Sequence, residues 1–326
     1  MNKKRVFSGI RATGRLHLGN YLGAIKGMLA LQDQYDCVFS IVDLHAITTP
    51  YDPKELKNSV RNVVLDYLGA GLDPEKCLIE VQSRTPHAEL AYFLSTIYPV
   101  ARLEDLPTYK EKKAQHPKYV NMGLLFYPVL MAADILIYKA ELVPVGLDQE
   151  PHLEVAREIA RKFNNMFGET FPEPKRFSTP GGYVPSITGT GKMSKTVEGS
   201  YITLADDLEM IRKRLAKAPT DSGKTGGEIP KAGGVANLFG LSKLFLDDDA
   251  YNSFVRDYRD GKIRYVEMKN VLAEAIYKEI LPIQERRKQY EQNPALVEQI
   301  VEAHAEKCGD FTGETMREVK EKMGLL

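Results

Sequence analysis

The chain has 326 residues, with 44 basic and 44 acidic side chains, 43% hydrophobic residues and no tryptophan. The ordinary apolar fraction and the balanced charge exclude a disordered or low-complexity chain, and they argue against a surface coated in positive charge for non-specific nucleic-acid binding. The length predicts two domains, with room for a substantial core.

The sequence carries no targeting or membrane signal that we can identify. The N-terminal segment lacks the apolar run of a signal peptide, and the longest apolar stretch is broken by Pro128 and Asp134, which leaves it too short to cross a bilayer. Three widely spaced cysteines without a CxxC pair disfavour a disulfide framework and a zinc site. We therefore expect a cytoplasmic protein with no membrane contact and no metal site of its own.

The first half of the chain alternates short apolar runs with segments of helical period. Strands are expected over residues 5–8, 37–42, 78–82 and 142–145, and helices over residues 18–34, 53–70 and 151–167. Continuous apolar strands that alternate with helices are typical of a buried parallel sheet. This half therefore predicts an α/β fold with a doubly wound, Rossmann-type parallel sheet.

The composition changes after residue 170. Residues 171–190 are rich in Pro, Gly and Thr and hold one short expected strand near 183–187. From residue 204 onward the pattern is helical around a glycine-rich loop, with helices expected over residues 204–218, 235–246, 265–291, 295–307 and 314–323. We predict an α/β domain over residues 1–204 and an all-helical domain over residues 205–326.

The first expected strand runs into a glycine turn and a helix that begins with His17, Gly19 and Asn20. The free N–H groups and the positive end of such a helix attract an anion, and His17 and Asn20 add hydrogen-bond donors. A tight turn with a polar cap would use the same residues. The segment alone leaves a phosphate site and a plain turn equally open.

A second motif, GKMSKT, occupies residues 191–196. Lys192 and Lys195 are three residues apart, with the hydroxyl of Ser194 between them, which suits a mobile clamp on phosphates. The motif lacks the upstream glycine spacing of a Walker loop. Taken in isolation, the two lysines favour a solvated basic loop.

A third motif places Tyr127, Met131, Asp134 and Tyr138 on one face of a helix that is expected to begin at Pro128. Asp134 lies two turns inside this helix among apolar residues, so it cannot be a cap. A buried carboxylate needs a partner. The alternatives at this point are a structural ion pair with an arginine and a contact with a substrate.

Taken together, HLGN at residues 17–20 and KMSKT at residues 192–196 resemble the paired signatures of class I aminoacyl-tRNA synthetases. Asn20 replaces a second histidine, and Thr196 replaces a serine. YPVLMAADIL at residues 127–136 looks like the specificity helix of bacterial tryptophanyl-tRNA synthetases, whose aspartate accepts the indole N–H. Because indole offers one donor, an acceptor-only carboxylate favours tryptophan over phenylalanine, and such sites reject the analogue by about 10⁴–10⁵.

The resemblance implies a tryptophan–tRNA ligase, which activates L-tryptophan with ATP and transfers it to tRNA(Trp). It also implies Mg²⁺ that arrives with ATP, a homodimer, and an anticodon-binding role for residues 205–326. The catalytic domain, residues 1–204, would hold an insertion at about 50–122 and the signature loop at 192–196. Basic clusters at 212–217 and 286–288 are expected to meet the tRNA.

The site residues follow from the same resemblance. Those implied for tryptophan are Phe7, Gly9, His45, Tyr127, Met131, Asp134 and Gln149. Those implied for ATP are Arg11, Ala12, Thr13, His17, Gly19, Asn20, Gly146, Leu147, Asp148, Val184, Lys192, Met193, Ser194, Lys195 and Thr196. The catalytic group would comprise His17, Lys112, Lys192 and Lys195.

Some of these assignments are less specific than others. Lys112 lies in a basic run that is also typical of a solvated face, and a lone His45 at a strand end is also typical of a structural residue. Arg11 stands where the family often has Gln, and Leu147 where Glu is common.

Three rival functions remain at this stage. Tyrosyl-tRNA synthetases have the same fold, but they usually carry Gln where Met131 stands and Tyr where Phe7 stands. A small-molecule nucleotidyltransferase would lack the second signature and the helical half. A tRNA-binding regulator without activity is disfavoured by the intact Lys192, Lys195 and Asp134.

Overall fold

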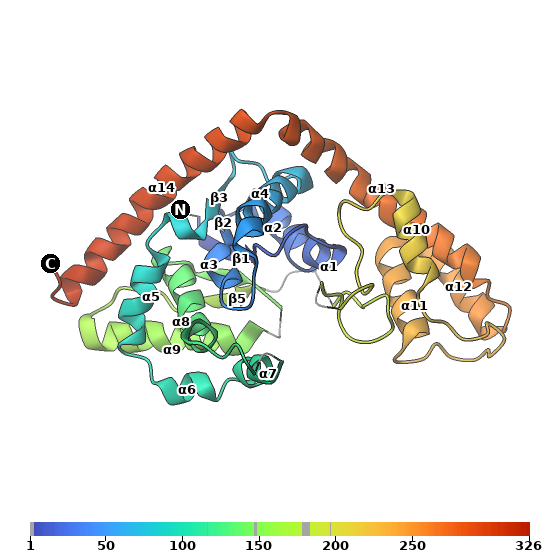
Figure 1. The fold of residues 1–326 in the computed structure, drawn as a ribbon, viewed down its shortest axis with the longest axis horizontal. Coiled ribbons are helices and arrows are strands. Elements are labelled where there is room, and N and C mark those ends of the chain that lie inside the picture. Colours follow the sequence, from blue (N-terminus) through green and yellow to red (C-terminus); the bar gives the residue numbers. More distant parts are fainter. Residues whose placement is uncertain (1–2, 116, 147–148, 178–182, 196) are drawn as a thin grey trace.

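The computed structural model describes residues 3–115, 117–146, 149–177, 183–195 and 197–326. In this part of the chain a parallel sheet has the strand order β3-β2-β1-β4-β5 (Figure 1). Its strands are β1 (Arg5–Arg11), β2 (Asp36–Val42), β3 (Cys77–Val81), β4 (Leu142–Pro144) and β5 (Lys175–Phe177). The predicted doubly wound, Rossmann-type sheet is confirmed.

Helices cover both faces of the sheet, because side chains of a strand alternate between its faces. Val6 and Ile10 of β1 belong to one apolar cluster, and Phe7 belongs to another. The helices of the α/β half are α1 (Leu18–Asn20), the π-helical turn η1 (Tyr21–Ile25), α2 (Lys26–Leu31), α3 (Asp43–Ala46), α4 (Pro53–Ala70), the 3₁₀ turn η2 (Gln82–Arg84), α5 (His87–Ser95), α6 (Val100–Glu104), α7 (Pro107–Gln115), α8 (Met122–Ile137) and α9 (Glu150–Phe167).

Two predictions in this half were wrong. The strand expected near residues 183–187 is reduced to one isolated bridge between Pro185 and Lys192, while β5 forms upstream because β4 offers it a parallel edge. Helix α8 begins at Met122 instead of Pro128, because the side chain of Asn121 accepts the Leu124 N–H and caps the helix earlier. Pro128 therefore lies inside the helix.

The C-terminal part is helical, as predicted, but its helices differ from the expected set. They are α10 (Leu208–Ala216), α11 (Gly234–Phe245), α12 (Asp248–Arg259), α13 (Tyr265–Gln292) and α14 (Pro294–Lys322). Helix α12 was not expected. Two expected helices at 295–307 and 314–323 form one helix, α14, because its buried residues continue past Gly309 and Gly313.

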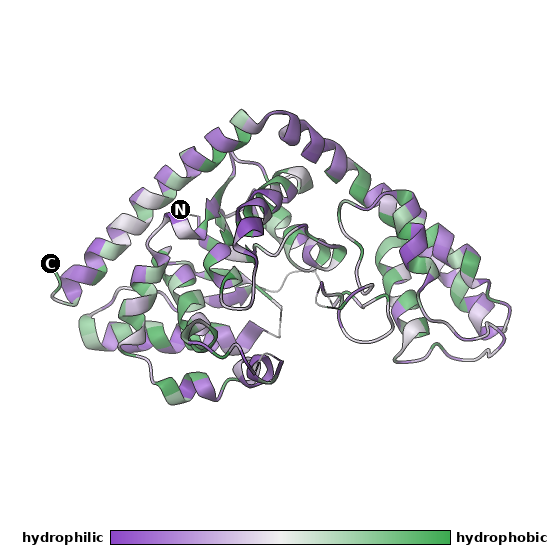
Figure 2. Cartoon of the chain, viewed as in Figure 1, coloured by the Kyte–Doolittle hydropathy of each residue, from purple (hydrophilic) through white to green (hydrophobic). Residues whose placement is uncertain are grey.

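Helices α13 and α14 form a long outer edge of the molecule (Figure 1). Helix α13 packs against α10 and α11 and then against α4, and α14 returns along β3 and α8. In Figure 2 hydrophobic and hydrophilic residues alternate along α14. Two lobes can thus be distinguished: a helical lobe of α10, α11, α12 and the first half of α13, and the α/β half on which α14 lies. The boundary near residue 204 stays a prediction.

No helix in the described ranges combines the length and the hydropathy needed to cross a membrane.

Candidate active site

Backbone hydrogen bonds join the start of the first helix to a segment almost two hundred residues later. The N–H of Leu18 donates to the carbonyl of Ile202 at 3.0 Å, and the N–H of Leu204 donates to the carbonyl of Leu16 at 2.9 Å. This pairing holds the end of the signature loop region against the glycine turn. The two signatures are therefore neighbours in space.

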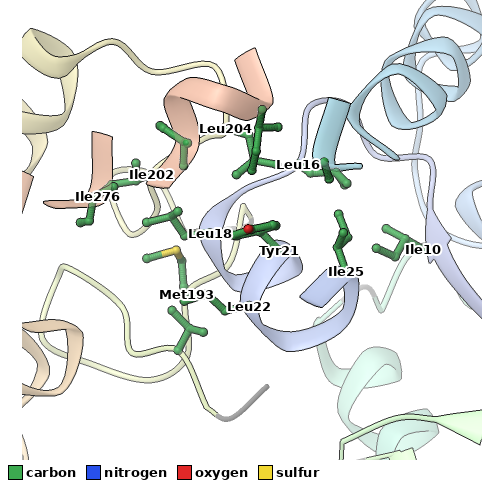
Figure 3. Packing of buried hydrophobic residues seen from close by; sticks show 14 of the residues in the cluster. Ile10, Leu16, Leu18, Tyr21, Leu22, Ile25, Met193, Ile202, Leu204 and Ile276 are labelled. Atoms are coloured by element: carbon green, nitrogen blue, oxygen red, sulfur yellow. The ribbon is translucent and has the colours of Figure 1, made fainter. Parts of the chain in front are cut away.

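Side chains of the signature loop complete this contact. Met193 is buried in the same apolar cluster as Leu18 and Leu22 (Figure 3). Lys195 is half-buried, and its Nζ donates to the carbonyl of Thr13 at 3.2 Å. The lysine thus ends at the glycine turn after β1, whereas a solvated basic loop would leave it in water.

His17 is the N-cap of α1. Its Nδ1 accepts the Gly19 N–H at 3.0 Å, and its own N–H donates to Oδ1 of Asn20 at 3.2 Å. Burial, followed by Lys195 and Lys192, lowers the pKa of His17 to about 4. The ring is therefore neutral near pH 7, and because Nδ1 accepts, its proton lies on Nε2, where it can donate to an anion. A polar cap and a phosphate donor are thus two roles of one residue.

A second group of cations lies beyond β1. Helix α7 places Nζ of Lys112 at 4.1 Å from the ring centroid of Tyr127, and burial, followed by Arg11, lowers the pKa of Lys112 to about 8. Arg11 ends β1 and donates from Nη2 to Oγ1 of Thr49 at 3.0 Å. The pKa of Lys195 is also lowered to about 8, first by burial. Crowded, partly desolvated cations of this kind favour a polyanionic ligand.

Gly9 lies in the central strand β1 and is nevertheless exposed, so nothing in the described chain covers this part of the sheet. A Cβ at this position would lie 2.8 Å from Cγ1 of Val42 and 3.3 Å from the carbonyl oxygen of Ser40. A glycine inside a strand often marks the close approach of a ligand or another backbone. The ring of Phe7, two residues earlier, stacks on Tyr138 at 5.7 Å.

The Gly9→Ala substitution is expected to lower the free energy of unfolding by about 1–3 kcal/mol, because the added methyl group overpacks the strand. The matched control is Gly309→Ala in α14, where nothing lies within 4 Å of the added atom and alanine should stabilise the helix by about 0.5–1 kcal/mol. Urea unfolding followed by circular dichroism measures both. Equal shifts in the two variants would contradict the packing argument.

Asp134 is 1% exposed and accepts three hydrogen bonds. Oδ2 lies 2.9 Å from Nε2 of His45, and Oδ1 lies 2.7 Å from Nε2 of Gln82 and 2.6 Å from Nδ1 of His87. The partners of the buried carboxylate are therefore two histidines and an amide. The structural ion pair with an arginine, which the sequence left open, is wrong. Burial would raise the pKa of Asp134, but His45 and His87 outweigh it and lower this pKa to about 2.

Sequence reasoning missed Glu80, Gln82 and His87, which belong to the same buried network. Glu80 interrupts the otherwise apolar run CLIEV of β3, and that interruption is the signal that could have found it. A carboxylate in the middle of a buried strand needs partners, and His87 is seven residues away.

The remaining predicted residues come from several segments of the α/β half. The Gln149 N–H donates to the Gly146 carbonyl at 3.1 Å as the chain enters α9, and the Val184 carbonyl accepts the Met193 N–H at 2.9 Å. The hydroxyl of Tyr127 lies 2.8 Å from Nε2 of His152. Ala12 is buried and Met131 is half-buried. Leu147, Asp148 and Thr196 lie outside the described residues.

The two predicted basic clusters are largely committed to contacts within the chain. Arg287 is buried against Asp66 at 2.6 Å, and Arg286 donates to the carbonyl of Gly69 at 2.8 Å. In the other cluster Arg212 pairs with Glu274, and Arg214 pairs with Asp206. Arg287 is buried within the chain, whereas Arg212 and Arg286 remain exposed, so the expectation that these clusters meet the tRNA stays a prediction.

Comparisons with known proteins agree with this geometry. A sequence model of the class I tRNA synthetases (W and Y) matches residues 1–281. The tryptophan–tRNA ligase of Porphyromonas gingivalis is 42% identical over 325 residues, which cover 98% of this chain and 99% of that protein. The corresponding ligase of Helicobacter pylori is 40% identical over 332 residues and covers both chains fully, at 100% each.

A solved structure gives the same result. The tryptophanyl-tRNA synthetase from Campylobacter jejuni, complexed with ADP and tryptophan, superposes with a TM-score of 0.85 at 32% identity, and the match covers 98% of this chain and 99% of that one. Fold, signature segments and full-length similarity therefore agree. The chain belongs to the class I tRNA synthetases of the tryptophan and tyrosine family, within its bacterial tryptophan–tRNA ligases.

Proposed function

We propose that this chain joins L-tryptophan to tRNA(Trp) in two steps. The carboxylate of tryptophan attacks the α-phosphate of ATP, which releases pyrophosphate and leaves tryptophanyl-adenylate. A ribose hydroxyl of the terminal adenosine of the tRNA, the 2′-hydroxyl by analogy with the class, then takes the acyl group and AMP leaves. The observation that carries the proposal is the contact of the second signature with the glycine turn that leads into the first, where Nζ of Lys195 lies 3.2 Å from the Thr13 carbonyl. The relative from C. jejuni, solved with ADP and tryptophan, supports it.

Catalysis in this proposal comes from positioning and charge, because no protein nucleophile is required. The Nε2–H of His17 and the ammonium groups of Lys112, Lys192 and Lys195 stabilise negative charge on the phosphates as pyrophosphate departs. The partly buried positions of His17, Lys112 and Lys195 support these roles. Backbone groups of the glycine turn and Val184 would hold the nucleotide.

Within the described ranges, no group of three His, Cys, Asp or Glu side chains is arranged to hold a metal ion. We propose that Mg²⁺ enters bound to the ATP phosphates, where it offsets their charge. No step above depends on a protein-bound metal.

Tryptophan would lie over the uncovered part of β1, between Gly9, Phe7 and helix α8. Asp134 would accept the indole N–H, Met131 and Tyr127 would shape the slot, and Gln149 would meet the ammonium group. A count of lone pairs supports the first role. A carboxylate has about four acceptor sites, and Asp134 uses three of them on described residues.

The remaining parts of the proposal concern the tRNA and the assembly. The helical lobe would read the anticodon, with the exposed Lys213 and Lys217 among its phosphate contacts. A homodimer is supported by large apolar side chains left exposed on the neighbouring helices α5, α6 and α8: Tyr92 at 66%, Val100 at 55% and Met122 at 71%. A cytoplasmic location is supported by three cysteines that are all free.

The test is ATP–pyrophosphate exchange with each of the twenty amino acids, followed by charging of tRNA(Trp). We expect exchange with tryptophan and charging of this tRNA. Exchange with tyrosine alone would overturn the substrate assignment, and no exchange with any amino acid would favour the tRNA-binding regulator.

The pH dependence of kcat/KM for ATP gives a further prediction. Lys112 and Lys195 must be protonated to bind phosphates, and the pKa of each is lowered to about 8, so the parameter should fall as pH rises through 8. The slope is about tenfold per pH unit for each lysine that must carry its proton. Lys195→Arg keeps the charge at high pH and should make the fall less steep. A profile that stays flat through this range would contradict the role of both lysines.

A further inference from the structure

Three ionisable side chains form a buried row beneath the proposed tryptophan slot. Glu80 lies on β3, His87 at the start of α5 and Asp134 on α8, and they are 1%, 0% and 1% exposed. Nε2 of His87 lies 2.8 Å from Oε1 of Glu80, and Nδ1 lies 2.6 Å from Oδ1 of Asp134. One imidazole therefore bridges two carboxyl groups without access to water.

The number of N–H groups on His87 limits the charge states that these three side chains can adopt. A neutral imidazole has one N–H, so it can satisfy only one of two carboxylates, whereas an imidazolium satisfies both. Glu80 is held in its ionised form because Oε1 also accepts the hydroxyls of Thr85 and Tyr138. A proton on Oε2 of Glu80 would find no partner among the described residues.

The groups around His87 come from five elements, and none of them competes with this arrangement. They are Glu80 and Thr85 from β3 and the turn after it, Asp134 from α8 and Tyr138 at its C-cap, Phe7 from β1, and Cys308 from α14, beside Tyr138. Burial raises the pKa of the Cys308 thiol to about 12, so it stays neutral. The carboxylates are the only negative charges in this group.

We propose that His87 is a positioning residue for tryptophan specificity: as an imidazolium held by Glu80, it keeps Asp134 ionised and turned toward the substrate. The inference rests on the proposed function, because it explains how Asp134 remains an acceptor-only group for the indole N–H. Without this cation, His45 would be the remaining histidine partner of Asp134, Glu80 would have none, and the two buried carboxyl groups in one network would share a proton. A protonated Asp134 would present a donor, and the slot would lose its preference for a substrate that donates.

Neighbouring contacts agree with this role. Burial would lower the pKa of His87, but Glu80 and Asp134 outweigh it and raise this pKa to about 10. The amide of Gln82 is fixed in one orientation, since its Oε1 accepts the Leu44 N–H at 3.0 Å while its Nε2 donates to Asp134. Gln82 and His87 donate to Oδ1 of Asp134 and His45 contacts Oδ2, so the described residues leave one acceptor position of Oδ2 for a substrate.

The test compares L-tryptophan with 3-(3-benzothienyl)alanine, in which sulfur replaces the indole N–H. We expect the wild-type chain to prefer tryptophan in kcat/KM for ATP–pyrophosphate exchange by about 10⁴-fold or more, because a site built around a substrate hydrogen bond rejects the analogue that lacks the donor to about this extent. His87→Gln should bring this preference to within about threefold, because a neutral amide cannot hold both carboxylates. A merely structural role would reduce kcat/KM for both substrates equally.

The matched control is His304→Gln. His304 is also buried beside β3, but its ring hydrogen bonds within the described ranges go to the Ile79 N–H and the Pro74 carbonyl, so its replacement should keep the wild-type preference. An unchanged preference in His87→Gln overturns the inference and leaves the proposed function standing. No preference in the wild-type chain overturns the Asp134 contact itself, on which the inference rests.

A second measurement decides the question if His87→Gln fails to fold. The wild-type chain, labelled with ¹⁵N in its six histidines, should show the His87 ring with both nitrogens protonated at pH 8. His87 is identified by its proton contacts with Tyr138 and Phe7. A neutral His87 ring at this pH would overturn the proposal.

Discussion

Lys195→Ala is expected to slow the formation of tryptophanyl-adenylate by about 10²–10³-fold, which is the range for removal of one preorganised group that stabilises developing charge. The affinity for tryptophan should change little, because the lysine lies at the glycine turn and not among the residues proposed for the indole. Nζ of Lys195 contacts the Thr13 carbonyl, and burial has lowered its pKa to about 8. A partly desolvated ammonium group exerts a stronger field on a phosphate than an exposed one.

The two effects can be measured separately. Single-turnover formation of the adenylate gives the rate, and titration of tryptophan fluorescence gives the affinity without interference, since the chain contains no tryptophan of its own. Lys231→Ala is the control, because this lysine lies exposed in the loop before α11. Equal losses of rate and of tryptophan affinity in Lys195→Ala would contradict the assigned role.

Arg287→Met is expected to lower the free energy of unfolding by about 3–5 kcal/mol, the cost of leaving a buried charge without its partner. Nη1 of Arg287 lies 2.6 Å from Oδ1 of Asp66, and Oδ2 of Asp66 accepts the Leu16 N–H at 2.8 Å. Burial raises the pKa of Asp66 and lowers that of Arg287, and the contact between them offsets this cost for both charges. Arg15 lies farther from Oδ1 of Asp66, at 3.4 Å, and Glu291 is a second partner of Arg287.

Denaturant unfolding followed by far-ultraviolet circular dichroism measures this change. Lys288→Met, at the exposed neighbouring position, should shift the free energy of unfolding by less than about 0.5 kcal/mol. A loss below about 1 kcal/mol for Arg287→Met would mean that the pair behaves as a surface salt bridge. Because Asp66 also holds Leu16, a large loss should be accompanied by weaker ATP binding.

The sequence was sufficient to predict the parallel sheet, because β1, β2 and β3 are short, largely apolar runs separated by helices. It was not sufficient for β5 or α14. β5 is three residues long, Lys175–Phe177, and it is a strand only because β4 lies beside it. Gly309 and Gly313 indicated a break, but packing of α14 on β3 and α8 outweighs local helix propensity there.

The candidate site likewise combines features that the sequence predicts with contacts that it does not. The motif around Asp134 indicated a buried carboxylate that needs partners, and the structure provides His45 and His87, which lie 89 and 47 residues away in the chain. Spacing within one helix carries no information about partners at such separations. The signatures at His17 and Lys195 could be paired only by their resemblance to a family, since the bonds that join them connect segments far apart in sequence.

The position of α14 has a consequence for how the chain is made. β3 is an edge strand of the sheet, and its outward amide at Ile79 is bonded by His304, a residue that leaves the ribosome more than two hundred residues later. Until α14 emerges, a nascent chain presents an unprotected edge that can pair with another chain. Helix α14 therefore covers the exposed edge of β3 late in synthesis, which protects the chain from aggregation, and it also packs against the finished core.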